Sequence, residues 1–261
     1  MIAGLKRAEI NEIRRCLRGW YNRPTGQLLL EMEREQLDDA LATLFGYHIV
    51  QVGSLLGDGL MGGSRISHRV LLDPDRDGET HHPAIRAYPD ALPVASDCVD
   101  VVLLPHTLEF ERDPHQILRE ADRVLIPEGH VVVLGFNPWS LWGLRRLLRQ
   151  RKQHTPPWAG DFLSVTRVKD WMALLGFEVV LVKRYFYRPP LKRRGVMARL
   201  QFLEKLGARL WPGLSGAYML VARKKVATLT PIKQRWRPRR KLVGDLAGPT
   251  TRSRHRVCQK E

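Results

Sequence analysis

The residues best suited to bind a ligand lie in a glycine-containing turn and at the end of the next apolar run. Gly53 and Gly57 follow the apolar residues 48–52, and glycines let a backbone approach a ligand closely at a strand end with free amides. Asp73 lies 16 residues after Gly57. A nucleotide-binding α/β fold commonly places the acceptor for ribose hydroxyls there. The alternative is a solvated turn, because PDRDG follows Asp73.

His106 is the candidate catalytic residue, since it follows a second buried run and is the side chain best placed for proton transfer. A neutral imidazole can accept a proton near pH 7 from an oxygen or carbon nucleophile. The alternative is a histidine that only forms hydrogen bonds within its loop. The sequence alone leaves both roles open.

The segment that must position His106 reads as strand, helix and strand. Residues 98–104 are a short run rich in valine and leucine, typical of a strand buried on both faces. Asp113 suits a helix N-cap, Pro114 the first helical position, and Pro127 ends the helix. Residues 130–136 form the second strand. Two strands joined by a helix predict parallel pairing with a right-handed crossover.

The remaining pattern predicts further helices and strands on both sides of this unit. Apolar periodicity indicates helices at residues 8–18, 27–45, 141–152 and 166–175, and a helix in the segment 188–213. Strands are expected at 48–53, 69–72, 84–88, 177–187 and 216–225.

The order and spacing of several short motifs resemble one known family. The run LP, VDVV, LEFERDP and LREADRVLIPEG, followed by an apolar strand, lies between Leu92 and Asn137. It resembles the fourth and fifth strands of class I S-adenosylmethionine-dependent methyltransferases of the ubiquinone-biosynthesis-like, type 11 group. The resemblance implies a doubly wound α/β fold, a mostly parallel seven-stranded Rossmann-like sheet with an antiparallel edge strand.

The resemblance also implies that S-adenosylmethionine is the cofactor and that it binds across the carboxyl ends of the first strands. The chain departs from the family pattern at two positions of the glycine motif: Gln51 replaces the usual acid and Leu55 the middle glycine. Tyr88 stands where the family often has an acid near the adenine. The implied cofactor-binding residues are Gln51, Gly53, Ser54, Leu55, Gly57, Asp73, Asp90, Ala91, Leu92, Leu104 and Pro105.

Length and composition favour one sizeable domain with additions. The chain has 261 residues, of which 44% are hydrophobic, and no stretch reaches the ~20 apolar residues of a transmembrane helix. Charged residues interrupt the N-terminal segment, so no secretory signal is predicted and a cytoplasmic location is expected. The three cysteines have neither metal-binding nor disulfide-framework spacing, and Cys98 is expected in the core.

The pattern of expected elements and the composition of the tail divide the chain into three predicted parts. Residues 1–47 form an N-terminal helical segment, 48–225 the methyltransferase-like domain with a basic insertion at 188–213, and 226–261 a basic tail predicted to be disordered. The formal net charge of +16 belongs to the last third, since residues 223–261 hold 13 Lys or Arg and two acids. Residues 1–182 are nearly neutral.

Three functions remain open at this stage. The first is a methyltransferase acting on a small-molecule or lipid-like acceptor. The second is a noncatalytic binding protein that keeps the fold, favoured by Gln51, Leu55 and Tyr88. The third is an RNA-binding or RNA-modifying protein that uses the basic tail. The basic residues 183–261 would suit a nucleic acid or an anionic membrane surface. No metal site is predicted.

Overall fold

The computed structural model describes residues 4, 6–54, 59–74, 82–148, 158–189, 200 and 202–225. By contact the chain divides into Met1–Val226 and Ala227–Glu261, and the predicted tail lies outside the described residues. The helices are α1 (Arg7–Tyr21), α2 (Pro24–Leu41), α3 (Pro114–Val124), α4 (Leu141–Leu148), α5 (Val165–Leu174) and α7 (Phe202–Leu210), with short 3-10 turns η2 (Gly59–Met61), η3 (Leu108–Phe110) and η4 (Pro212–Leu214). The strands are β1 (His48–Val52), β2 (His68–Leu72), β3 (Ala84–Ile85), β4 (Val99–Pro105), β5 (Leu125–Phe136), β6 (Phe177–Tyr185) and β7 (Ala217–Lys224).

The seven described strands form one sheet in the order β3-β2-β1-β4-β5-β7-β6. β1 pairs in parallel with β2 and β4, and β4 pairs in parallel with β5. β7 runs antiparallel between β5 and β6. The predicted doubly wound α/β sheet of seven strands, mostly parallel with antiparallel pairing at one edge, is confirmed.

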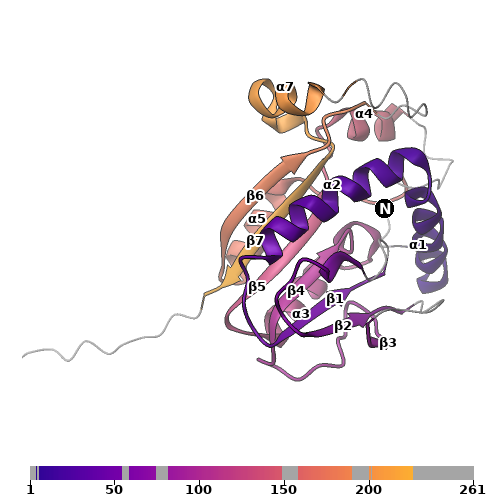
Figure 1. The fold of residues 1–261 in the computed structure, drawn as a ribbon. Helices are drawn as coiled ribbons and strands as arrows, with labels where there is room; N and C mark the ends of the chain where they lie inside the picture. The colour runs from indigo at the N-terminus through magenta and orange to yellow at the C-terminus, as the bar shows by residue number, and fades with distance from the viewer. Residues whose placement is uncertain are drawn as a thin grey trace, which may run out of the picture. The chain divides into compact units, whose positions relative to one another are not determined.

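Helices cover both faces of this sheet (Figure 1). One core joins α1 and α2 to one face of the strands, through side chains such as Leu37, Val101 and Leu134. The other joins α3 and α5 to the opposite face, through Ile117, Val102 and Val133. Successive strand residues alternate between the two cores, as expected for strands buried on both sides.

α3 shows how local sequence positions the central strands. Asp113 caps the helix by accepting a hydrogen bond from the Gln116 amide at 3.0 Å, and Pro114 occupies the first turn. The helix ends at Val124, and β5 begins directly at Leu125 rather than at residue 130. α3 connects β4 to β5, which run parallel, so the carboxyl ends of both strands lie at the same edge of the sheet.

Two local expectations were wrong. The second helix was expected at residues 27–45, but α2 begins at Pro24, which lies in the first turn, where its missing amide hydrogen costs nothing. Cys98 was expected in the core, but it is exposed because it precedes β4.

Candidate functional site

The carboxyl ends of β1, β2 and β4 border a small hollow. Its lining comes from the loops after these strands and from α1, and the hollow is shallow and narrow. Open α/β sheets bind ligands at this position, where the strand order reverses. The lining residues are Gly53, Ser54, Asp73, Thr107, Arg14 and Arg18.

Gly53 gives the floor of the hollow its shape. Its φ of 94° lies in a region that L residues rarely adopt, and a Cβ there would meet only the Thr107 hydroxyl at 3.4 Å. The Gln51 side chain donates a hydrogen bond to the Gly53 carbonyl at 2.9 Å, and the Gly53 amide donates to the Leu72 carbonyl at 2.7 Å. Gln51 thus holds the turn while the glycine leaves room above it.

Asp73 faces the hollow rather than bulk solvent. The residue is 4% exposed, and its carboxylate accepts hydrogen bonds from the Ser54 amide, at 2.9 Å, and from the Ser54 hydroxyl. A buried carboxylate at the end of β2, next to a glycine turn, matches the geometry that binds ribose hydroxyls in nucleotide-binding α/β folds.

A second hollow, with a cavity volume of about 40 Å³, adjoins the first. Arg14 lines both, while Tyr88, Asp90 and Glu111 line only the second. Arg14 is 4% exposed and is ion-paired with Glu111. The Arg14 side chain therefore separates two spaces that would otherwise form one elongated cleft along the strand ends.

Further contacts hold α1 over this cleft. Arg7 donates a hydrogen bond to the Asp90 carboxylate at 3.0 Å, and its guanidinium lies 4.2 Å from the centre of the Tyr88 ring. Trp20, near the other end of α1, packs edge-on against Trp142 of α4 at 5.9 Å. α1 is thus attached to the main body at both ends and in the middle.

His106 lies beneath α2, in a buried cluster of charged groups. Its Nε2 is 2.8 Å from a Glu33 oxygen, and its Nδ1 is 2.9 Å from a Glu109 oxygen. All three side chains are at most 1% exposed. The second Glu109 oxygen accepts a hydrogen bond from the Phe136 amide. His106 has a φ of 52°, a conformation that histidine tolerates better than most residues.

The two carboxylates decide the protonation state of His106. Burial alone lowers the pKa of the imidazole, but Glu33 and Glu109 more than offset this and raise it to about 9. Burial raises the pKa of both carboxyl groups. His106 is therefore a cation at neutral pH. The catalytic role of His106 stays a prediction. With a pKa of about 9 the protonated imidazole is the favoured form at pH 7, and each ring nitrogen then faces a carboxylate oxygen.

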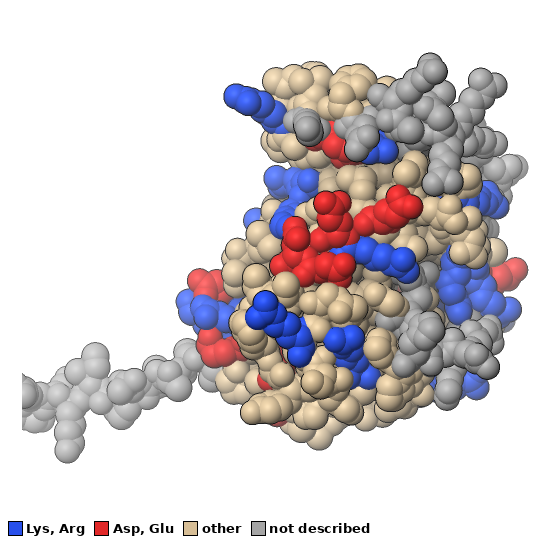
Figure 2. All heavy atoms as spheres, in the orientation of Figure 1, with Lys and Arg blue, Asp and Glu red and all other residues tan. Residues whose placement is uncertain are grey.

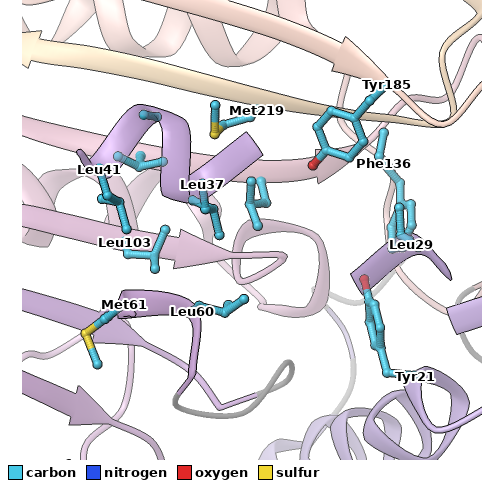
Figure 3. Close-up of a cluster of buried hydrophobic side chains, with 14 of the residues drawn as sticks. Tyr21, Leu29, Leu37, Leu41, Leu60, Met61, Leu103, Phe136, Tyr185 and Met219 are labelled. Carbon is cyan, nitrogen blue, oxygen red and sulfur yellow. The ribbon is translucent and has the colours of Figure 1, made fainter. Parts of the chain in front are cut away.

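Two tyrosines complete the surroundings of this cluster. Figure 3 shows the hydroxyls of Tyr21 and Tyr185 directed into the same interior region from α1 and β6. The Tyr21 and His106 rings are 6.2 Å apart. Burial raises the pKa of both phenols well above 10, and the charge of Glu33 adds to the effect. Both hydroxyls are therefore neutral and can donate hydrogen bonds.

Stability is expected to fall as the pH rises from about 6.5 to about 9. The folded pKa of His106, about 9, exceeds the unfolded value near 6.5, so the stabilisation is complete below 6.5 and is lost as pH passes 9. The full effect is about 3 kcal/mol at most. Urea unfolding across this range measures it. A Glu33→Gln variant should show a smaller slope, because it removes one cause of the raised pKa, and an equal slope would contradict the assignment.

The structure brings together some of the residues implied by the sequence. Gly53, Ser54 and Asp73 line the first hollow, and Gln51 supports it. Asp90 lines the second hollow, whereas Leu92 is 5% exposed and packs in the core. Leu55 and Gly57 lie outside the described residues. Of the others, Leu104 and Pro105 are buried at the end of β4, and Ala91 is exposed and forms an isolated bridge with Tyr88.

Sequence reasoning missed Thr107, Arg14, Arg18, Glu33 and Glu109. A signal existed for two of them. Glu33 lies in the apolar stripe of α2, between Leu29 and Leu37. Arg14 follows the apolar residue Ile10 by one helical turn in α1. A charged residue inside an apolar stripe must be paired when it is buried, which marks it for attention. Within the part of the chain that the structure describes, no cluster of His, Cys, Asp or Glu suits a metal ion.

Several solved structures with the same fold are described as S-adenosylmethionine-dependent methyltransferases, and another is the [4+2]-cyclase SpnF, with a TM-score of 0.52 at 14% identity. One from Thermotoga maritima matches with a TM-score of 0.56 at 18% identity, covering 81% of this chain and 99% of its own. The geranyl diphosphate C-methyltransferase of Streptomyces coelicolor, solved with S-adenosyl-L-homocysteine, matches with a TM-score of 0.52 at 16% identity, covering 77% and 80%. At these identities the matches define the class of fold.

Sequence comparison identifies the family. A methyltransferase domain model matches residues 69–133. The uncharacterized protein YafS of Escherichia coli is 35% identical over 217 residues, which cover 82% of this chain and 85% of YafS. The chain belongs to the class I S-adenosylmethionine-dependent methyltransferases, in the type 11 group.

Proposed function

We propose that this protein transfers a methyl group from S-adenosylmethionine to a small-molecule or lipid-like acceptor. One observation carries the proposal: the buried Asp73 carboxylate faces the Ser54 amide beside the Gly53 turn, at the strand ends where this fold binds ligands. The residues present fit an adenosyl group. Gly53 carries no side chain that would enter the hollow, Asp73 would accept hydrogen bonds from ribose hydroxyls, and Tyr88 and Asp90 line the adjoining hollow, where the adenine would lie.

In this proposal the protein binds the cofactor and orients the acceptor, and its side chains do not transfer protons. The cofactor supplies an already activated methyl group, so aligning the acceptor suffices for reaction. Arg18 lines the same hollow as Ser54 and is placed to pair with the cofactor's carboxylate. His106 is a positioning residue: as a cation it fixes Glu33 of α2 and Glu109 of η3.

Cofactor binding in this proposal requires α1 to move. Arg14 divides the cleft, and its positive charge opposes the sulfonium of the cofactor. The ion pair with Glu111 holds Arg14 in place. Displacement of α1 would join the two hollows and uncover Asp73. The helix would then close again over the bound cofactor and exclude water.

Weakening the contact of Arg14 is expected to speed cofactor binding. The change Glu111→Gln removes the charge that holds Arg14, and the association rate of S-adenosylmethionine should rise about fivefold, equivalent to about 1 kcal/mol of lost attraction. Stopped-flow fluorescence can follow it, because Trp20 moves with α1. Glu178→Gln is the control, since Glu178 pairs with Arg223 on the sheet, away from the cleft. A rate equal to that of the control would contradict the gating role of α1.

The activity can be tested with S-adenosylmethionine that carries a radioactive methyl group. The intact chain is incubated with a lipid extract and an aqueous metabolite extract of Escherichia coli, and each fraction is counted. Label should enter one fraction, and the Asp73→Asn variant should transfer little of it. If the protein binds the cofactor but labels neither fraction, the enzyme proposal is wrong.

A noncatalytic binding protein is the second candidate, and two observations favour it. Gln51 brings no negative charge to the cofactor's ammonium group, and Arg14 stands inside the cleft. A protein that binds the cofactor without turnover would pass the binding test and fail the labelling test. The two measurements together therefore separate the two candidates.

A further inference from the structure

Two helices at the carboxyl edge of the sheet expose apolar stripes. In α4 the exposed residues Leu141, Leu144 and Leu147 follow one another at three-residue spacing, and Leu147 is 82% exposed. In α7 the exposed residues include Phe202 and Leu210, two turns apart, which are 57% and 53% exposed. Helices of this spacing normally turn such a stripe toward the core.

The opposite face of α4 already supplies the core contact. Trp142 is 2% exposed and packs 5.3 Å from Trp158 and 5.2 Å from Phe186. Its indole nitrogen donates a hydrogen bond to the Arg188 carbonyl at 2.9 Å. The leucines on the outer face are therefore not needed to hold α4 on the protein.

We call the two stripes together the edge patch and define it as the exposed apolar side chains of residues 139–147 and 202–214. The Asn137 side chain donates a hydrogen bond to the Gly213 carbonyl at 2.7 Å, which joins the turn before α4 to η4. Trp139 and Trp211, beside these two residues, are 74% and 54% exposed. Figure 1 places α4 and α7 at the same end of the sheet, and Figure 2 shows uncharged surface at this end with both basic and acidic side chains beside it.

The two segments of sequence that contain the edge patch are strongly basic. Residues 139–158 and 188–214 together hold 12 Lys or Arg and a single acid, Glu204. Glu204 is paired with Arg188 at 3.1 Å. Apolar side chains combined with unbalanced positive charge are the composition that binds the headgroup region of an anionic bilayer.

Other occupants fit the edge patch less well. A second copy of the chain would bring together two copies of segments that are basic in sequence, and like charges repel. Single-stranded RNA would pair with the arginines and stack on the tryptophans, but it would leave the leucine stripes in water. An anionic phospholipid surface satisfies both the leucines and the arginines.

We propose that the edge patch docks the protein on anionic phospholipid bilayers, with the apolar stripes of α4 and α7 inserted among the headgroups. The docking itself does not depend on methyl transfer. If the acceptor is lipid-like, which rests on the proposed function, docking also brings the carboxyl edge of the sheet to the lipid. No helix in the described part of the chain is long and apolar enough to cross a membrane, so attachment would be peripheral.

Vesicle co-sedimentation of the intact chain tests this proposal without any cofactor. The wild type should bind phosphatidylcholine vesicles that contain phosphatidylglycerol, and should bind pure phosphatidylcholine far less. Leu144→Glu with Leu147→Glu should lower the partition coefficient at least about tenfold, because two inserting side chains become charged. The matched control is Leu174→Glu with Val180→Glu, which makes the same charge change at residues 85% and 58% exposed on α5 and β6.

The control separates docking by the edge patch from attraction by the basic tail, since both double variants keep the tail and have equal net charge. The control should lose less than about twofold. Equal losses in the two double variants would overturn the proposal. So would binding of single-stranded RNA with no vesicle binding at the same salt concentration. Unchanged circular dichroism melting of both variants is the check that they fold.

Discussion

Replacing His106 by asparagine is expected to lower the free energy of unfolding by about 3 to 5 kcal/mol. Asparagine tolerates the positive φ of 52° at this position, so backbone strain adds little. The loss comes from Glu33 and Glu109, which would remain buried without the cation between them. Urea unfolding at neutral pH measures the change, and His115→Asn on the exposed face of α3 is the control, with a loss below about 1 kcal/mol.

A rescue experiment distinguishes this charge effect from simple loss of packing. If Glu33→Gln and Glu109→Gln are added to His106→Asn, no buried charge remains, and part of the lost stability should return. Failure of the triple variant to recover any stability would show that packing of the imidazole, for example against Phe136 at 4.3 Å, accounts for the loss.

Replacing Asp73 by asparagine is expected to weaken S-adenosylmethionine binding by about 10- to 100-fold. A hydrogen bond to a charged group contributes about 1.5 to 3 kcal/mol, and the proposed ribose contact would lose its charged acceptor. Asparagine keeps the size of the side chain and one acceptor oxygen, so the contact with the Ser54 amide can persist. Calorimetric titration measures the affinity.

The matched control for this substitution is Asp170→Asn, which makes the same change at an exposed position of α5. It should bind the cofactor as the wild type does. If Asp73→Asn and Asp170→Asn have equal affinities while both melt like the wild type, Asp73 does not contact the cofactor. The proposed binding position would then be wrong even though the fold is confirmed.

The sheet could be predicted from the sequence because its signals are local. Asp113 and Pro114 begin α3, and an apolar run lies on each side of this helix, so one parallel strand-helix-strand unit could be derived from the residues. The family resemblance of this unit then predicted the full sheet of seven strands. The observed ends of the elements differ from the predicted ones where local sequence preferences compete with tertiary packing. β5 begins at Leu125 because Leu125 pairs with Val99 of β4, ahead of a shift in the register of the β4–β5 ladder.

The candidate site could be predicted only in part, because its neighbours come from distant segments. Gly53 and Asp73 were found from their spacing, and the structure places both at one hollow. The partners of His106 could not be found in this way, since Glu33 lies 73 residues away on another helix. The apolar stripe of α1 marks Arg14 as buried, but its place in the cleft could not be predicted, because nothing local shows that α1 folds back over the strand ends.

Calorimetric titration of S-adenosylmethionine into the intact wild-type chain measures whether the cleft beneath α1 binds this cofactor. We expect saturable binding of one molecule per chain, accompanied by a rise in melting temperature, because a ligand that binds only the folded state stabilises it. The absence of saturable heat and of any melting shift, in a protein that melts cooperatively, would contradict it. The α/β sheet would then remain, and the cleft beneath α1 would not be a cofactor site.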